Sequence, residues 1–511
     1  MLHNSSDTIC AISTPPGQGG IAVIRVSGAD AFSICNKIIK SGWGQAPPLQ
    51  AKTLTFGSIF RGDEILDEVL VSTFKNPFSY TGEDTVEISC HGSLYIQREI
   101  IKLLLANGCR LATAGEFTQR AFLNGKIDLS QAEAVGDLIA STSATAHRIA
   151  MMQMRGGISN ELSALSDKLL HFTSLVELEL DFADEDVEFA DRSQLKGLAL
   201  QVETAINRLV DSFEAGNAIK NGIPVAIAGE TNAGKSTLLN RLLKEERAIV
   251  SDIHGTTRDA IEDTVDIDGL MFRFIDTAGI RETFDAIEQL GIERSFQKIE
   301  QASIVLWVID LTNDTLEPKQ IIERTKGKKL IFILNKADLL NNEERNRKTA
   351  YYSQFNEDYI VISAKSDPTP RDRLISPQIT QINAETRVYA ADYQQYNLCK
   401  SAKICGQSTY ETAPVEYSNI TALERKLVET ANIPQIGEND VVVANMRHYE
   451  ALTNALAAIQ RVVQGLDACI SGDLISLDIR ECLFHLGQIT GKQISTEDVL
   501  GNIFSRFCIG K

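Results

Sequence analysis

One run of eight residues has the types and spacing needed to bind phosphate. Positions 229–236 read Gly-Glu-Thr-Asn-Ala-Gly-Lys-Ser, which fits the pattern G-x-x-x-x-G-K-[ST], and they follow an apolar stretch at 225–228. In this pattern the glycines let backbone N–H groups turn toward phosphate oxygens. We expect Lys235 to reach the outer phosphates and Ser236 to bind Mg²⁺. The other expected contacts of this loop are Asn232, Ala233, Gly234 and Thr237.

A second motif downstream fits the same chemistry. Residues 276–279 read Asp-Thr-Ala-Gly and follow the apolar stretch 271–275. An aspartate at that place can hold the water shell of the metal, and the N–H of Gly279 can meet the γ-phosphate. We therefore add Asp276, Thr277, Ala278 and Gly279 to the expected nucleotide contacts.

Two more motifs select the base. Asn335, Lys336 and Asp338 follow the apolar stretch 330–334. A carboxylate at Asp338 can accept both the N1 and the N2 protons of guanine, and adenine has no such pair of donors. The last motif follows 360–362 and supplies a wall for the base with Ser363, Ala364 and Lys365. Four motifs in order, each at the end of a predicted strand, favour GTP over ATP.

The segment between the first two motifs predicts a switch. Residues 255–259 read Gly-Thr-Thr-Arg-Asp, and Thr257 is the natural second hydroxyl ligand for Mg²⁺ when a γ-phosphate is present. An ordinary threonine-rich turn is the alternative. Many small GTPases place a glutamine after the second motif to orient the attacking water, but this chain has Ile280, which cannot hydrogen-bond. Acids within 281–294 are candidates for that task, and their alternative is a solvated helix face.

Composition limits the class of protein. The chain has 511 residues, 43% of them hydrophobic, so we expect three or four domains. No stretch of eighteen apolar residues and no signal pattern occurs, which predicts a cytoplasmic protein without membrane contact. Nine scattered cysteines indicate reduced thiols rather than disulfides or zinc. The net charge of −18 means that any RNA contact needs a local basic patch or a basic partner.

The order of patterns predicts a multidomain α/β plus α protein. Residues 1–118 alternate short β-branched runs with turns and predict an α+β domain. Residues 119–215 and 434–511 have helical spacing and are expected to pair into one bundle. The nucleotide domain, 216–433, is inserted between them, carries an insertion at about 366–417, and ends in a helix near 423–430. The polar residues 214–222 predict a linker into it.

Four sequence blocks outside the nucleotide domain point to a family. They are residues 7–20, the run 80–84 (Tyr-Thr-Gly-Glu-Asp) with 91–92, the run 115–124 (Gly-Glu-Phe-Thr-Gln-Arg-Ala-Phe-Leu-Asn), and the terminal 507–511 (Phe-Cys-Ile-Gly-Lys). Together they resemble the MnmE (TrmE) family of tRNA modification GTPases. The resemblance covers nearly the whole chain except the insertion.

The resemblance implies a function. Members of this family work with the flavoprotein MnmG to add an aminomethyl or carboxymethylaminomethyl group at C5 of the wobble uridine (position 34) of certain tRNAs. The one-carbon unit comes from 5,10-methylene- or 5-formyl-tetrahydrofolate bound by the N-terminal domain, through which the homodimer forms. Two copies combine with MnmG in a heterotetramer or larger complex. Their GTPase domains close on each other with GTP, and K⁺ supplies the charge that an arginine finger supplies elsewhere.

The resemblance also assigns residues. The folate positions correspond to Arg25, Glu87, Lys126 and Lys511, and a carboxylate with cations suits a pterin with a glutamate tail. The K⁺ ligands correspond to Asn232, Ser251, Ile253 and Thr256, and Ser251, Thr256 and Thr257 also count as GTP contacts. Glu288 is implied as the residue that orients the water, and it is grouped with Lys235 and Cys508 as catalytic.

Three alternatives stay open. The alternative for Arg25 and Lys126 is an ordinary surface charge. The alternative for Glu87 is an outward-facing strand residue. Cys508 could be a plain buried cysteine; a prenylation box is disfavoured by Gly510 and Lys511. The whole chain could be a ribosome-assembly GTPase that binds rRNA, although it has no recognisable RNA-binding module.

Overall fold

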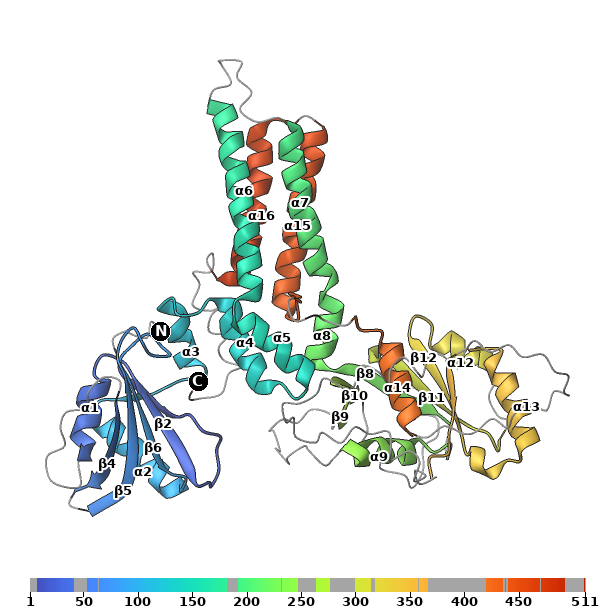
Figure 1. Ribbon diagram of the computed structural model, residues 1–511, viewed down its shortest axis with the longest axis horizontal. Helices are drawn as coiled ribbons and strands as arrows, with labels where there is room; N and C mark the ends of the chain where they lie inside the picture. Colours follow the sequence, from blue (N-terminus) through green and yellow to red (C-terminus); the bar gives the residue numbers. More distant parts are fainter. Residues whose placement is uncertain are drawn as a thin grey trace, which may run out of the picture. The chain divides into compact units, whose positions relative to one another are not determined.

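The computed structural model divides the chain into two compact units. It describes residues 7–40, 53–62, 64–181, 192–230, 232–246, 263–275, 299–313, 318–356, 358–365, 420–434, 437, 440–468, 470–491 and 510. The first unit combines residues 1–221 with 435–511, and the second, 222–434, is inserted between these two parts (Figure 1). None of the helices in the described ranges has the length and apolar character to cross a membrane.

The first unit begins with a mixed sheet and three helices. Its described strands lie in the order β3-β4-β5-β6-β2-β1-β7. They are β1 Ile9–Ile12, β2 Ile21–Ser27, β3 Ile39–Lys40, β4 Leu54–Arg61, β5 Glu64–Phe74, β6 Thr85–His91 and β7 Arg110–Leu111. The helices are α1 Ala31–Ile38, α2 Leu94–Ala106 and α3 Glu116–Leu123. The boundary expected at 118 therefore falls inside α3.

The two faces of this sheet differ in chemistry because side chains alternate along each strand. Ile24, Val71 and Ile88 point to one face, where they form a closed core with residues of α1 and α2. The opposite face carries Arg25 directly across from Glu87 in the antiparallel pair β2–β6. Two of the four side chains that the resemblance assigns to folate, Arg25 and Glu87, thus share the face that α1 and α2 do not cover.

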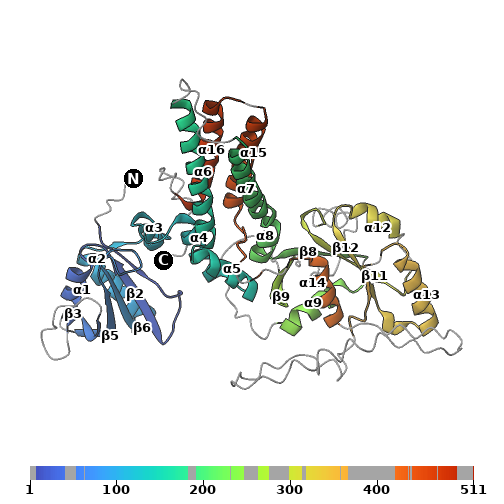
Figure 2. The same ribbon diagram turned by 45° about the horizontal axis from the view of Figure 1, so that its top comes forward.

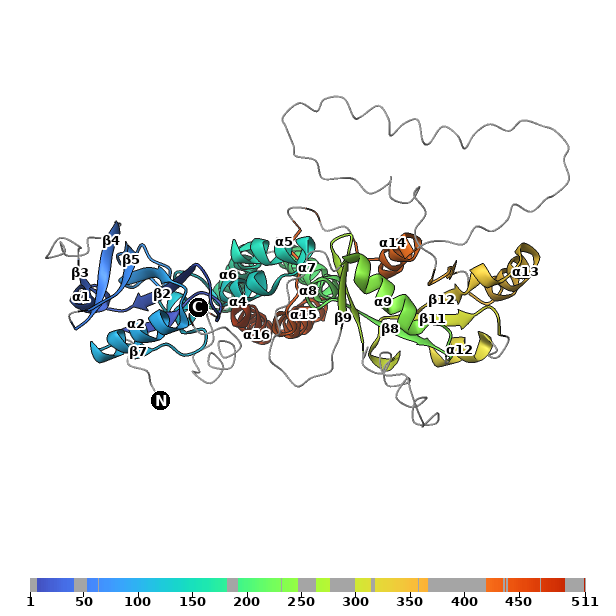
Figure 3. The same ribbon diagram turned by 90° about the horizontal axis from the view of Figure 1, so that it is seen from below.

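The rest of the first unit is helical. Its helices are α4 Leu129–Ala140, α5 Ala144–Met154, α6 Gly157–Asp181, α7 Arg192–Asp211, α8 Phe213–Asn221, α15 Met446–Asp467 and α16 Gly472–Thr490. Helices α6, α7, α15 and α16 run side by side (Figures 1 and 2) and are seen nearly end-on in Figure 3. The two helical segments that lie more than 200 residues apart therefore form one bundle, as predicted.

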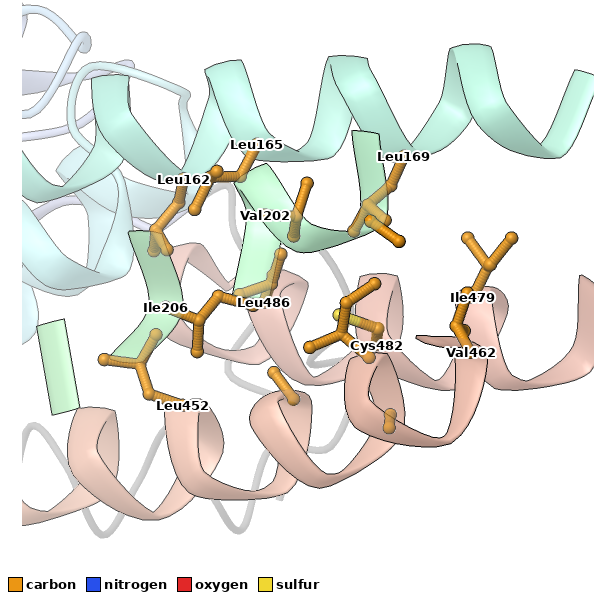
Figure 4. Close-up of a cluster of buried hydrophobic side chains, with 14 of the residues drawn as sticks. Leu162, Leu165, Leu169, Val202, Ile206, Leu452, Val462, Ile479, Cys482 and Leu486 are labelled. Carbon is orange, nitrogen blue, oxygen red and sulfur yellow. The ribbon is translucent and has the colours of Figure 1, made fainter. Parts of the chain in front are cut away.

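The bundle core consists of apolar side chains that recur with helical spacing, as expected for residues 119–215 and 434–511. Side chains from all four helices point toward one another in Figure 4, among them Leu165, Val202, Leu452 and Leu486. Each fully buried aliphatic side chain stabilises the fold by about 1.5–3 kcal/mol. These apolar side chains therefore form the hydrophobic core of the bundle.

The predicted linker at 214–222 is wrong for most of its length, since α8 extends to Asn221. Its buried positions Phe213, Gly216 and Ile219 recur every three residues, and Phe213 belongs to the bundle core. The Phe213 ring stacks on Tyr449 with centroids 4.3 Å apart. A Cβ at Gly216 would lie 2.2 Å from the carbonyl oxygen of Val443, so the glycine allows close packing and does not mark a linker.

The second unit is a mostly parallel sheet with helices. Its described strands follow the order β13-β12-β11-β8-β10-β9, with only β9 antiparallel to its neighbour. They are β8 Ile223–Gly229, β9 Asp263–Ile267, β10 Leu270–Phe274, β11 Ile304–Asp310, β12 Lys329–Asn335 and β13 Tyr359–Val361. The helices are α9 Lys235–Glu246, α12 Pro318–Arg324, the 3₁₀ turn η2 Ala337–Leu339, α13 Asn342–Ser353 and α14 Ile420–Ala431.

The sheet order explains how motifs far apart in sequence meet. Strands β8, β11 and β12 are parallel neighbours, so their carboxyl ends lie at one edge of the sheet (Figure 1). The strands predicted at 225–228, 271–275, 330–334 and 360–362 all form, as does the closing helix α14. The insertion at about 366–417 lies outside the described residues.

Candidate functional site

The backbone of the phosphate-binding loop requires both of its glycines. Gly229 ends β8 with φ 139°, and Gly234 has φ 104°, both in the region that favours glycine. A Cβ at Gly229 would lie 2.2 Å from the carbonyl oxygen of Val308, and one at Gly234 would lie 2.2 Å from Asn335 Nδ2. Asn232 also has a positive φ, 64°. Such alternation of backbone handedness turns successive N–H groups into an anion-binding concavity.

The loop leads into the first turn of α9. Lys235 and Ser236 are the first two residues of that helix, where free N–H groups and the helix dipole favour an anion. Lys235 Nζ donates to the carbonyl oxygens of Gly229 and Glu230 over 2.9 and 2.6 Å. The ammonium group therefore lies over the start of the loop, and Ser236 has the place expected of a Mg²⁺ ligand.

Asn335 connects the phosphate loop to the base motifs. Its Nδ2 donates to the carbonyl oxygen of Ala233 over 2.7 Å, and its Oδ1 accepts from the backbone N–H of Ala364 over 3.0 Å. Only 2% of Asn335 is exposed. Three of the four predicted motifs are thus joined by one buried amide, a contact that the sequence pattern did not indicate.

The remaining base-site residues differ in exposure. Asp338 lies in η2 and is exposed, as is Lys365, whereas Ser363 and Ala364 are buried. The Ser363 hydroxyl is buried without a hydrogen-bond partner among the described atoms. Arg241 from α9 donates to the carbonyl oxygens of Ser363 and Ala364. An open carboxylate beside a rigid backbone wall fits a planar base with two N–H donors.

Sequence reasoning missed Asp310, the last residue of β11. Its Oδ2 accepts from Lys336 Nζ over 2.5 Å, and its Oδ1 accepts from the N–H and the hydroxyl of Thr312 over 2.9 and 2.6 Å. Burial raises the pKa of this carboxyl, but the donors from Lys336 and Thr312 outweigh burial and hold it below the ordinary value. The sequence contains a signal that could have identified Asp310, because this residue ends an apolar stretch, at the place where the motif residues also occur.

Arg25 and Glu87, two of the residues predicted to bind folate, lie side by side on the sheet face opposite α1 and α2. Arg25 donates from Nε to Glu87 Oε1 over 2.9 Å, and its guanidinium lies 5.3 and 5.5 Å from the ring centroids of Tyr80 and Phe117. The Tyr80 hydroxyl and the Thr118 hydroxyl are 2.9 Å apart. Burial raises the pKa of Tyr80, so its hydroxyl stays protonated. The cation is thus held by a carboxylate and two aromatic faces.

Lys126 and the chain terminus approach the same domain. Lys126 Nζ donates to the carbonyl oxygen of Pro77 over 2.9 Å, and its stem lies against Gly82. Gly510 is buried: its carbonyl oxygen accepts from the Ser13 hydroxyl over 3.0 Å, and a Cβ there would lie 2.1 Å from the carbonyl oxygen of Ile12. Gly510 therefore lies beside the end of β1, which pairs with the strand that carries Arg25.

Several predicted site residues lie outside the described part of the chain. These are Ser251, Ile253, Thr256, Thr257, Asp276, Thr277, Ala278, Gly279, Glu288, Cys508 and Lys511. Their assignments stay predictions.

Comparisons with known proteins cover nearly the whole chain. The family model described as the MnmE helical domain matches residues 129–508, and the one described as the GTP-binding protein TrmE N-terminus matches residues 8–126. The protein named tRNA modification GTPase MnmE from Bacteroides fragilis is 53% identical over 99% of this chain and 100% of its own length. The proteins of that name from Bacteroides thetaiotaomicron and Flavobacterium johnsoniae are 52% and 49% identical, with the same coverage.

Proposed function

Since the chain belongs to the MnmE family of tRNA modification GTPases, we propose that it hydrolyses GTP to drive modification of the wobble uridine of tRNA. The observation that carries this proposal is the buried Asn335 amide, which joins the phosphate loop to the wall of the base site. That connection would hold the proposed triphosphate site and the proposed guanine site in one frame. Lys235 and Ser236 would hold the phosphates and Mg²⁺, with Thr257 and Asp276 completing the metal site.

We propose that Asp338 and Lys336 select guanine. Asp338 is exposed at the mouth of the site, where its carboxylate can accept two N–H donors in parallel. Such bidentate contacts to a charged acceptor give specificity, because adenine would leave the carboxylate unpaired. Glu288 would orient the attacking water, and K⁺ bound by Asn232, Ser251, Ile253 and Thr256 would stabilise charge in the transition state.

The N-terminal domain is the proposed folate site. Arg25, Glu87 and Lys126 offer two cations and a carboxylate on one domain, and Glu87 Oε2 has no hydrogen bond to the other described residues. That oxygen can accept from pterin N–H groups, and the half-buried ring of Tyr80 beside Arg25 suits a planar heterocycle. The folate would supply a one-carbon unit. Lys511 follows Gly510 and would add a third cation, and Cys508 would take part in the modification.

The same domain is the proposed dimer interface. Leu54 and Phe56 of β4 and Leu70 and Phe74 of β5 point away from the core, and Phe56 is directly across from Leu70. Leu54 is 68% exposed and Phe56 57% exposed, which is unusual for large apolar side chains on neighbouring strands. A second copy of the chain would cover this patch. The flavoprotein MnmG is the proposed partner of the dimer, and tRNA the shared substrate.

The decisive experiment is mass spectrometry of wobble uridine from cells with and without this gene. We expect the C5 aminomethyl-type substituent to disappear on deletion and to return with the intact gene, but not with a gene carrying Asp338→Asn. A wobble uridine that keeps its substituent, together with a defect in rRNA maturation, would support the ribosome-assembly alternative instead.

A further inference from the structure

We propose that Asp310 is a positioning residue for guanine nucleotide binding, acting through Lys336. The inference rests on the proposed GTP site and adds to it a residue from a different strand. Asp310 ends β11, and Asn335 ends the neighbouring parallel strand β12, where the two are directly paired. The N–H of Leu311 donates to the carbonyl oxygen of Asn335 over 3.1 Å, which fixes the two strand ends against each other.

Lys336 follows Asn335 in an uncommon backbone conformation. Its φ is 61°, the left-handed region, which costs an ordinary side chain about 1–2 kcal/mol. This conformation persists only where the surroundings determine it, and such residues concentrate at ligand sites. The ion pair from Lys336 Nζ to Asp310 Oδ2 is one such constraint, and the pairing of β11 with β12 is another.

The carboxylate of Asp310 is itself held rigidly. Its side chain is 6% exposed, and Thr312 donates twice to the oxygen that Lys336 does not use. A carboxylate fixed in this way gives the ammonium group one position. An unpaired lysine would instead sample many rotamers, and ordering it on ligand binding would cost up to about 2 kcal/mol.

Lys336 lies in the proposed guanine site, so the ion pair that fixes its side chain bears on binding of the guanine base. It stands between Asn335, which bonds the phosphate loop, and Asp338, the proposed guanine acceptor. With its ammonium group tied to Asp310, the lysine presents its methylene stem, not its charge, as a preformed apolar wall. Asp310 thus lowers the ordering cost of nucleotide binding without touching the nucleotide.

A double-mutant cycle in the full-length chain tests the inference. The variants are Asp310→Asn, Lys336→Met and the two combined, and the measurement is titration of a fluorescent GDP analogue. Asp310→Asn alone is expected to weaken binding about tenfold, the effect of 1.4 kcal/mol. In the Lys336→Met background the same change is expected to have less than about a twofold effect, because the group through which Asp310 acts is gone. Asp310→Glu, which keeps the charge, should recover part of the affinity.

Controls separate this role from a purely structural one. Thr312→Val removes one donor to Asp310 but leaves the Lys336 pair, so its affinity should stay within about threefold of the parent. Equal losses from Asp310→Asn in both backgrounds, or no loss in the parent, would overturn the inference. Failure of the unmodified chain to bind the analogue would instead contradict the proposed function.

Discussion

The side chain of Asn335 donates a hydrogen bond to the carbonyl oxygen of Ala233 over 2.7 Å, and so connects a base motif to the phosphate loop. Replacing it with alanine would leave that carbonyl and the N–H of Ala364 buried without partners, at about 1–3 kcal/mol each. We expect Asn335→Ala to weaken both GTP and GDP binding at least tenfold, measured by equilibrium titration. Asn341→Ala is a matched control, since the Asn341 side chain caps α13 by accepting from the N–H of Glu344. Unchanged binding by Asn335→Ala would contradict the bridging role.

The sequence predicted which strand precedes each motif, because each motif combines an apolar strand with polar residues at its end. The pattern identifies residues that contact a ligand and says little about residues that contact one another. Asn335 was therefore predicted as a base contact while its bond to Ala233 was not. Asp310 was missed for the same reason, because its partner Lys336 lies 26 residues away in sequence.

The misread linker has a different physical cause. Glycine and asparagine at 216, 217, 221 and 222 have low helix propensity, but Glu214, Ala215, Ala218 and Lys220 are good helix formers, and tertiary packing overrides propensity where a close approach requires glycine. Gly216 faces the backbone of Val443, a residue on the far side of the inserted unit in sequence. Local sequence cannot reveal such a contact.

The Arg25–Glu87 pair leads to a prediction about folate. Glu87→Gln removes the charge that holds Arg25 and replaces an acceptor oxygen with a donor. We expect binding of 5-formyl-tetrahydrofolate, measured by calorimetry, to weaken at least tenfold while GTP binding stays unchanged. Glu64→Gln serves as the control, because Glu64 is an exposed acid on β5. Equal folate affinity in both variants would remove Glu87 from the site.

The exposed apolar patch on β4 and β5 predicts self-association. Phe56→Glu combined with Leu70→Glu would place four charges in a symmetric interface, so we expect the homodimer to dissociate into monomers. Light scattering coupled to gel filtration measures the mass directly. Leu105→Glu alters an exposed leucine on α2, which covers the other face of the sheet, and should leave the dimer intact. A double variant that stays dimeric would place the interface elsewhere.

The proposed potassium site predicts a choice between monovalent cations. We expect GTP hydrolysis in K⁺ to exceed that in Na⁺ by at least tenfold, which corresponds to about 1.4 kcal/mol of transition-state stabilisation. Asn232→Gly tests the ligand cleanly, because glycine accepts the positive φ of this position while removing the side-chain oxygen. This variant should hydrolyse GTP equally slowly in both ions. Equal rates for the unmodified chain in K⁺ and Na⁺ would count against the site.

A buried histidine predicts how the stability of the first unit depends on pH. His448 on α15 lies 2.8 Å from Glu133 on α4, and Arg447 binds the same carboxylate and the last carbonyl oxygens of α16. Burial lowers the pKa of His448, and the nearby Arg447 and Lys220 add to this, although Glu133 opposes it. Burial raises the pKa of Glu133, but His448 and Arg447 outweigh burial and lower the pKa to about 2.

Both shifts mean that the unfolded chain takes up protons at a higher pH than the folded chain does. The His448 contribution is complete above the ordinary value of 6.5 and is lost as the pH falls below it, by at most about 1.4 kcal/mol per pH unit. The Glu133 contribution is complete above 4.5 and is lost as the pH falls toward about 2. Of these two groups, only His448 contributes to the pH dependence of stability between pH 8 and 5.5. From pH 8 to pH 5.5, we expect the melting temperature of His448→Gln to fall by about 2–4 °C less than that of the parent chain, measured by circular dichroism. His147→Gln, which removes an exposed histidine of α5, should keep the parent slope. If the melting temperature falls equally with pH in His448→Gln and in the parent chain, His448 does not resist protonation in the folded state.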